Sequence, residues 1–520
     1  MMQIQMMYLK KYSKKTWFIA MISTFIFGLF THLFGLVNII HNYDDIAVQP
    51  AGFGTSLSSG RWFLHILAMI FGKMFGNYNV SLWNGVIFII LISISTSFFI
   101  QTFEIKSRKN AIIIGIIFIT FPTATSTLFF KYTSVYYSIA ILMSICAAWS
   151  ARKCKYGYVI SPLLTSFSLG IYQAYIPFTI AIFVLLLLKD ALIIKNEVKI
   201  LFKRGIYYCY NIIAGLIFYF LFLKIILIYY KTSLSNYQGI NNMGKLSFSD
   251  IPYLIKEAFI SFVLLPINDY CSLTFTLFIK LLYLLLFIII ITSIIYILFI
   301  KKENIDICLF IVLICLLIPI SINFIVIMCP NSTVYTLMVY PFTLVLCTPL
   351  IIFESFPIFN KNSKNFKTIL SKASTLVVLL ISVNYAYFAN VNYTSLYYVN
   401  RQTENYLQSI ITQVRMTDGF TAEKQWALIG KINDPLLNYV WTHETLYGGN
   451  ASTRRLITAY SKNSWFRNYC GYSISFTDEE TIKNIKQHDD FIAMPCWPND
   501  GSIKIIDDVI VIKFEDSDLN

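Results

Sequence analysis

Charged residues are scarce in this sequence. Asp, Glu, Lys and Arg make up 13% of its 520 residues, whereas soluble domains carry about 25%. Hydrophobic residues make up 57%, and several uninterrupted apolar stretches reach the roughly 20 residues that a helix needs to cross hydrocarbon. The short alternating segments of a membrane β-barrel are missing. The composition therefore predicts a polytopic α-helical membrane protein.

Acidic residues are scarcer than basic ones, and the formal net charge is +14. The Lys and Arg residues gather in short loops between apolar blocks, as the positive-inside bias requires of cytoplasmic loops. No basic stretch is interleaved with aromatic residues in a polar region, so nothing indicates nucleic-acid binding.

Cysteine chemistry is also sparse. The ten cysteines include no C-x-x-C pair and no Cys/His metal spacing. Cys470 and Cys496 lie in the polar C-terminal region and could form a disulfide if that region is exported, but the sequence does not show whether they are close.

The basic clusters predict about eleven spans, with the N-terminus inside and the C-terminus outside. Lys10, Lys11, Lys14 and Lys15 precede the first span, so residues 41–80 form an outer loop. Within that loop, Arg61–Phe75 is typical of an amphipathic or interfacial helix. The expected spans are Trp17–Ile40, Leu82–Phe103, Ala111–Phe130, Tyr136–Ala151, two within Tyr158–Leu188, Tyr207–Tyr230, Leu273–Ile300, Ile307–Met328, Tyr340–Phe353 and Leu370–Phe388.

The apolar region Tyr158–Leu188 is longer than one crossing requires, and both of its flanks are basic. Because both flanks are then on the cytoplasmic side, the region must cross the membrane an even number of times. Gly170, and Gln173 shortly before Pro177, interrupt the region, so we expect two short helices that meet near the outer surface. Such a break is tolerated only where the chain packs in protein or lines a cavity.

The chain becomes polar after about residue 389. We therefore expect a membrane domain over residues 1–389 and a small exported α/β domain over residues 390–520. In the latter, Asn400–Val414 has the pattern of an amphipathic helix, and Trp426–Ile429 and Asp507–Phe514 have that of strands.

The first outer loop carries the residues best suited to chemistry. Asp44 and Asp45 follow the first span; adjacent carboxylates there can act as a general base, bind a metal or simply be solvated. Arg61 and Trp62 could bind a phosphate at the level of the lipid headgroups, or they could simply anchor the chain at the membrane interface. A base for an acceptor hydroxyl and a cation for a departing phosphate are what sugar transfer from a lipid phosphate needs.

These residues bring a family into view. The motif DD…SGRW (Asp44, Asp45, Ser59, Gly60, Arg61 and Trp62), LGIYQAYIPF (Leu169–Phe178) and MPCWPNDGSIKIIDDVIVIKF (Met494–Phe514) together resemble the C-type membrane glycosyltransferases. More narrowly, the chain resembles the bacterial type II glucosyltransferases that modify O-antigen. The resemblance extends over nearly the whole chain, although each motif is short.

The resemblance implies an inverting transfer of glucose or a related hexose from undecaprenyl-phosphate-sugar to a cell-surface polysaccharide or lipid-linked glycan. The site would face outward from the bacterial cytoplasmic membrane. Asp44 or Asp45 would be the base and Arg61 would contact the donor phosphate, while Trp62, Tyr172 and Gln173 would line the cavity. An alternative interpretation of Gln173 is that it only satisfies backbone groups at the helix break. The resemblance also allows a divalent metal near the Asp pair, as in some C-type enzymes, although nothing in the sequence requires a metal or another cofactor.

Two further residues have weaker claims. Lys131, in the second outer loop, is a donor-phosphate candidate, although a Lys that reaches the interface is the commoner case. Asp269 is an acceptor-site candidate or a solvated loop charge. A flippase for lipid-linked sugars is the main alternative function, but transporters place ionisable residues near mid-span, and the expected spans hold few charges.

Overall fold

The computed structural model describes residues 2–54, 56–193, 197–235, 249–267, 271, 273, 275–301, 304–330, 333–356, 361–431, 447–448, 457–458 and 460–515, with backbone only for 2–14 and 361–362. The chain divides into two compact units. The first contains Met1–Ile39, Ala51–Tyr393 and His443–Asn450, and the second contains Ile40–Pro50, Thr394–Thr442 and Ala451–Asn520. The residues of the expected outer loop 41–80 are thus shared between the two units.

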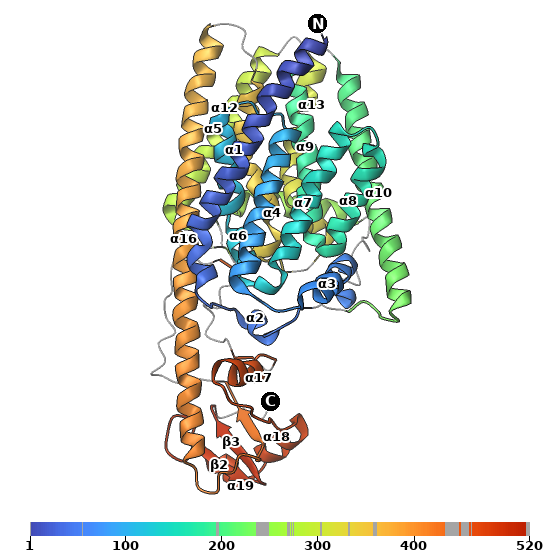
Figure 1. The fold of residues 1–520 in the computed structure, drawn as a ribbon. Coiled ribbons are helices and arrows are strands. Elements are labelled where there is room, and N and C mark those ends of the chain that lie inside the picture. Colours follow the sequence, from blue (N-terminus) through green and yellow to red (C-terminus); the bar gives the residue numbers. More distant parts are fainter. Residues whose placement is uncertain are drawn as a thin grey trace. The chain divides into compact units, whose positions relative to one another are not determined.

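The first unit is a bundle of helices (Figure 1). Its helices are α1 (Met2–Val37), α3 (Trp62–Phe75), α4 (Ser81–Thr102), α5 (Arg108–Thr120), α6 (Pro122–Phe129), α7 (Lys131–Lys153), α8 (Gly157–Ile171), α9 (Ile176–Ile193), α10 (Val198–Tyr229), α11 (Ile251–Leu264), α12 (Leu277–Ile300), α13 (Ile305–Ile322), α14 (Ile325–Met328), α15 (Thr343–Ser355) and the first part of α16 (Lys361–Arg415). Helix α4 packs against α1 and α7, α7 against α8, and α8 against α10.

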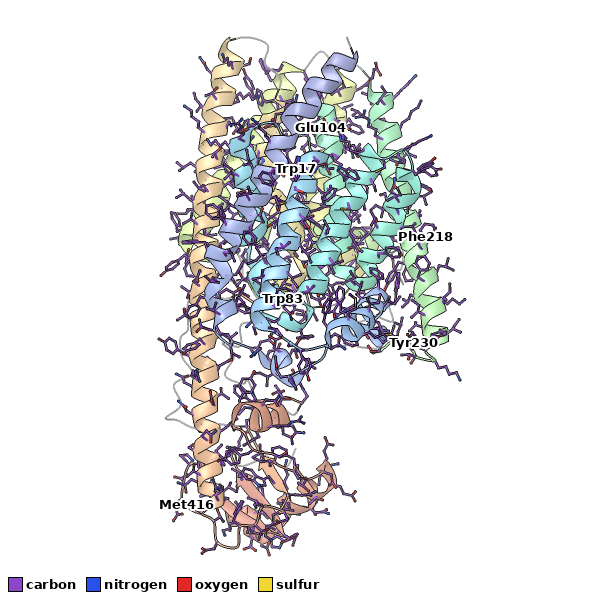
Figure 2. All side chains as sticks on the ribbon, viewed as in Figure 1. Trp17, Trp83, Glu104, Phe218, Tyr230 and Met416 are labelled. Carbon is purple, nitrogen blue, oxygen red and sulfur yellow. The ribbon has the colours of Figure 1, made fainter. Side chains whose placement is uncertain are left out.

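Nine helices among the described residues are long and apolar enough to cross a membrane. Two shorter apolar helices, Gly157–Ile171 and Tyr340–Ser355, coincide with the other two expected spans. The multi-helix membrane class is therefore supported, while the number eleven stays a prediction. Only 17% of the most apolar stretch of α10 is buried inside the protein. Figure 2 shows the side chains of this helix, Phe218 among them, projecting from it. An apolar surface of this kind suits contact with lipid.

The expected break in the Tyr158–Leu188 region is confirmed. Helix α8 ends at Ile171, Tyr172 is extended, and a 3-10 turn over Gln173–Tyr175 leads into α9. Pro177 lies in the first turn of α9, where a missing N–H leaves no helical hydrogen bond unmade. The helix expected over Arg61–Phe75 is also confirmed, since α3 begins one residue later.

The second unit combines short helices with a three-stranded sheet. Strand β3 (Val509–Lys513) is central, with β1 (Trp426–Ile429) parallel to it on one side and β2 (Ile503–Ile506) antiparallel on the other. Asp507 and Asp508 form the β2–β3 turn with φ of 49° and 64°, in the left-handed region that tight hairpin turns use. The helices are α2 (Tyr43–Ala47), the last part of α16, α17 (Lys462–Ser464), α18 (Glu479–Lys486) and α19 (Asp489–Ala493).

The helix expected over Asn400–Val414 is confirmed, and it forms the end of α16, because the residues before Asn400 continue the helix without a break. The strand expected over Asp507–Phe514 begins only at Val509, because its first two residues form the hairpin turn. The strand expected over Trp426–Ile429 is confirmed. Cys470 and Cys496 are both free thiols.

A small apolar core holds the sheet of the second unit to its helices. Amphipathic α18 and α19 supply buried residues that pack on the alternating inward positions of the strands. The core residues are Ala427, Ile429, Ile485, Phe491, Met494, Ile506, Val509 and Val511.

Candidate functional site

The two acidic residues of the first loop lie in helix α2. Asn42 precedes this helix, and its side-chain oxygen accepts hydrogen bonds from the backbone N–H groups of Asp44 (3.0 Å) and Asp45 (2.9 Å). An Asn in this position satisfies N–H groups that the first helical turn leaves without partners. The sequence HNYDD therefore forms a turn of fixed shape that presents two neighbouring carboxylates.

Asp45 is the buried member of the pair, with no exposed surface. Its Oδ2 lies 3.2 Å from Nδ1 of His41, which is itself buried. The His41 ring packs edge-on against Tyr469, with the ring centroids 6.0 Å apart. A fully enclosed carboxylate bound to a histidine is placed to hold the local structure rather than to meet a substrate.

Asp44 is only partly buried and faces a different partner. The hydroxyl of Tyr460 donates a hydrogen bond to its Oδ1 at 3.1 Å. Burial raises the pKa of Asp44, the Tyr460 hydrogen bond opposes that rise, and the charge of Asp45 adds to it. A carboxylate whose pKa is raised toward neutrality is a better general base than an ordinary Asp.

Further contacts within the second unit hold α2 and the residues after it. The Ser464 hydroxyl lies 3.5 Å from the carbonyl of Ala47, and the Asn468 amide donates to the carbonyl of Gln49 at 3.2 Å. The acidic segment is thus surrounded by residues from much later in the chain.

Arg61 belongs to the first unit and directly precedes α3. Its backbone N–H donates to the carbonyl of Ser56 at 2.9 Å, and its guanidinium carbon lies 4.9 Å from the centroid of the Tyr172 ring. Tyr172 in turn stacks on Tyr137, with centroids 4.5 Å apart and planes 6° from parallel. The cation is therefore held over an aromatic face, an arrangement that suits guanidinium better than ammonium.

Gln173 holds the loop that carries Arg61. Its side-chain amide donates to the carbonyl of Ser59 at 2.8 Å and to the Tyr219 hydroxyl at 3.1 Å. The Tyr219 hydroxyl in turn donates to the carbonyl of Gly60 at 3.1 Å. Gly60 has a φ of 70°, and a Cβ there would lie 2.8 Å from both the Gln173 amide and the Tyr219 hydroxyl. The helix break therefore supplies the group that fixes the turn before Arg61.

Trp62 packs in the aromatic interior next to this turn and is 3% exposed. Its ring contacts Phe63, Phe167 and Phe222. A Cβ on Gly170 would lie 2.7 Å from the indole, so this glycine permits the close approach of α8 to α3. These contacts make Trp62 a packing residue; a cavity-lining role for Trp62, Tyr172 and Gln173 stays a prediction.

The remaining candidates are Lys131 and Asp269. Lys131 is the first residue of α7 and is 2% exposed, so it is buried in protein rather than extended to the surface. Asp269 lies outside the described residues. Within the part of the chain that the structure describes, no three His, Cys, Asp or Glu side chains lie close enough together to hold a metal ion.

The structure thus gathers the predicted residues into two groups, one in each unit. Asp44 and Asp45 belong to the second unit, whereas Arg61, Trp62, Tyr172 and Gln173 form one connected cluster in the first. Sequence reasoning missed the residues that hold the acidic helix. His41 offered a local signal, because it lies four residues before Asp45. No such signal comes from Tyr460, from Tyr469 or from Asn400, whose side chain exchanges two hydrogen bonds with the backbone of His41, because all three lie far away in the sequence.

Comparison with known proteins places this geometry in context. A family model described as Glucosyl transferase GtrII matches residues 33–346, which is more than half of the chain. The matched region includes the acidic segment, the Arg61 turn and the α8–α9 break. Comparison with curated proteins and with solved structures found no match.

Proposed function

Because this chain belongs to the GtrII family of glucosyl transferases, we propose that it moves glucose, or a related hexose, from undecaprenyl-phosphate-sugar to a cell-surface polysaccharide or lipid-linked glycan. The family supports the glucosyl transfer, and the apolar helices support a membrane location. The proposal adds the lipid donor, the acceptor and the outer face of the cytoplasmic membrane. A lipid-phosphate donor fits an acidic helix and an arginine that both follow closely after a membrane span.

The transfer is a single displacement. An acceptor hydroxyl oxygen attacks the anomeric carbon of the sugar while the bond from that carbon to the phosphate oxygen breaks. The hydroxyl proton passes to the carboxylate of Asp44, and polyprenyl phosphate leaves with the bonding electrons. Attack on the face opposite the leaving group inverts the anomeric configuration.

Arg61 binds the phosphate in this proposal. Its planar guanidinium can bind two phosphate oxygens at once and offset the charge that develops on the leaving group. Support comes from its fixed position over Tyr172 and from the hydrogen bonds of Gln173 and Tyr219 that hold the preceding turn. Lys131 remains a second phosphate candidate and Asp269 an acceptor-site candidate.

The observation that carries the assignment of the base is the difference between the two carboxylates. Asp45 is enclosed and bound to His41, whereas Asp44 is partly exposed, bound to a tyrosine hydroxyl, and raised in pKa. Only a carboxylate that an acceptor can reach is able to take its proton. We therefore assign the base to Asp44 and a structural role to Asp45.

The test is release of polyprenyl phosphate by purified protein that is given polyprenyl-phosphate-glucose and the cell-envelope polysaccharide of its own cells. Asp44→Asn should lower the rate by roughly 10²–10⁴-fold, the usual contribution of a general base. Asp45→Asn keeps a hydrogen-bond acceptor for His41 and should lose less activity than Asp44→Asn. Asp500→Asn removes an exposed carboxylate of the same unit and serves as the control. Full activity of Asp44→Asn would refute the assignment.

A flippase is separated from a transferase by the same preparation in vesicles. Movement of the intact lipid-linked sugar across the bilayer, with no release of polyprenyl phosphate from any donor, would favour the flippase. The proposed orientation has its own test: a reporter fused after Lys367 should report the cytoplasm, and one fused after Asn520 the outside.

A further inference from the structure

The acidic helix is enclosed by a part of the chain that the family match does not reach. The match ends at residue 346, whereas Asn400, Tyr460 and Tyr469 all come later. These residues share the second unit with Ile40–Pro50. Residues outside the matched region therefore form the immediate surroundings of the proposed base.

Tyr460 is the residue among them that touches Asp44. Its hydroxyl donates to Oδ1 of Asp44 at 3.1 Å, and its ring packs edge-on against the ring of Tyr43, with centroids 6.5 Å apart. Its side chain is nevertheless 55% exposed. Much of an aromatic residue is thus exposed beside the carboxylate, and tyrosine combines an apolar ring with a polar hydroxyl.

We propose that Tyr460 is a positioning residue of the acid–base site, which orients the Asp44 carboxylate through its hydroxyl and supports the apolar face of an acceptor pyranose on its ring. The inference rests on the proposed function. It makes the second unit the acceptor side of the enzyme, with a hydroxyl of a stacked sugar ring directed at the carboxylate of Asp44. Tyr460 would then help to select the acceptor, while Arg61 would hold the donor.

The charges around Asp44 decide the direction of the pH effect. Tyr460 faces it as a hydrogen-bond donor and Asp45 faces it as a like charge, with His41 and Tyr469 around Asp45. The pKa of Tyr460 is itself raised by burial and by the Asp44 carboxylate, so the hydroxyl keeps its proton at neutral pH. Loss of that hydroxyl removes the contact that lowers the pKa of Asp44, so the base stays protonated to higher pH.

Tyr460→Phe and Tyr460→Ala separate the two roles in the full-length protein. Tyr460→Phe keeps the ring and should move the acidic limb of the kcat/KM profile to higher pH, with a roughly three- to tenfold loss at the acidic end and little loss on the alkaline plateau. Tyr460→Ala should show the same displacement and also raise the acceptor KM by about tenfold, without a matching change in the donor KM.

Tyr472→Phe is the matched control, because it deletes a tyrosine hydroxyl of the same unit that bonds to Arg415 rather than to the acidic helix. It should leave the pH profile and both KM values unchanged. Thermal unfolding of each variant checks that the fold is intact. A merely structural role for Tyr460 would lower kcat at all pH values without moving the limb.

The possible results separate a failure of the proposed function from a failure of the role given to Tyr460. If wild type releases no polyprenyl phosphate from any donor, the proposed function itself fails. If wild type is active and Asp44→Asn is inactive, but Tyr460→Phe keeps the wild-type pH profile and Tyr460→Ala keeps the wild-type acceptor KM, only the role of Tyr460 is overturned.

Discussion

The backbone of His41 and the side chain of Asn400 exchange two hydrogen bonds, each 3.0 Å long. The N–H of His41 donates to Oδ1 of Asn400, and the Asn400 amide donates to the carbonyl of His41. Both residues are buried. A side-chain amide that pairs with both backbone groups of one residue fixes the position of that residue, so α16 determines where the acidic segment begins.

Asn400→Ala should loosen the acidic segment. The substitution removes two buried hydrogen bonds to the His41 backbone, each worth about 0.5–1.5 kcal/mol. Hydrogen exchange at residues 41–47 should accelerate and kcat should fall, because Asp44 is less well positioned. Asn484→Ala, the same change at an exposed position of α18, should alter neither. Unchanged exchange in Asn400→Ala would mean that other contacts suffice to hold the segment.

Gly60→Ala should weaken donor binding. The residue would have to keep a left-handed backbone, which costs about 1–2 kcal/mol, and its Cβ would press on the Gln173 amide and the Tyr219 hydroxyl. The turn before Arg61 must then shift, so we expect a higher donor KM. Gly471→Ala has a similar φ of 78° with nothing within 4 Å of the added Cβ. It controls for backbone strain, and an equal effect of both variants would exclude the Arg61 turn as the cause.

Lysine should not be able to take over the role of Arg61 in donor binding. Lysine keeps the charge but loses the planar group that lies over the Tyr172 ring and that can bind two phosphate oxygens at once. We expect the donor KM to rise about tenfold in Arg61→Lys and further in Arg61→Ala. Arg401→Lys changes another arginine over a tyrosine ring, at 5.7 Å, on an exposed part of α16. Donor kinetics that are normal in Arg61→Lys would argue against phosphate binding at this residue.

Glu104 should contribute to stability in a pH-dependent way. Burial works against its ionisation, but the hydrogen bond and charge of Lys153 and the charge of Lys189 outweigh it and lower its pKa to about 2. Because this pKa is below the ordinary Glu value of 4.5, the contribution of the charge to stability is complete above about pH 4.5 and is lost as the pH falls toward 2. Figure 2 labels this residue.

The measurement for Glu104 is thermal unfolding between pH 7 and pH 3. Glu104→Gln should unfold at a lower temperature than wild type at pH 7, and the gap should narrow at pH 3. The side chain is 48% exposed, so solvent screening keeps the difference small. Glu423→Gln, at an exposed position of the second unit, should run parallel to wild type. A gap that stays constant with pH would show that the charge of Glu104 is not the cause.

Local pattern was enough to predict the helices and the break between α8 and α9. Apolar runs of span length report on burial over a whole helix. Gly170 and Pro177 identified the interruption because both residues disfavour a continuous helix, and the polar Gln173 lies between them. The continuity of α16 was not predictable in this way. The polar residues after Phe388 suggested an end to the apolar stretch, and nothing in their local pattern distinguishes a new helix from an extended one.

The candidate site shows the same division between local and distant information. The acidic pair and Arg61 were found because their types and spacing are visible within one loop. The unlike surroundings of Asp44 and Asp45 were not visible, since they arise from Tyr460 and from the contacts of His41 with Asn400 and Tyr469. Contacts between residues several hundred positions apart leave no periodicity that a single sequence reveals.

The order of the strands has a consequence for how the protein is made. The central strand β3 is synthesised some eighty residues after β1, with which it is paired so that Ile510 lies opposite Trp426 and Lys513 opposite Ile429. The β2–β3 hairpin is local and can close within microseconds of its appearance, but β1 can pair with β3 only from then on. The acidic helix, synthesised long before, meets Asn400 and Tyr460 only when that late region has emerged. Nascent chains should therefore lack a finished base, which would delay sugar transfer until Asn400 and Tyr460 have both been synthesised and have folded onto the acidic segment.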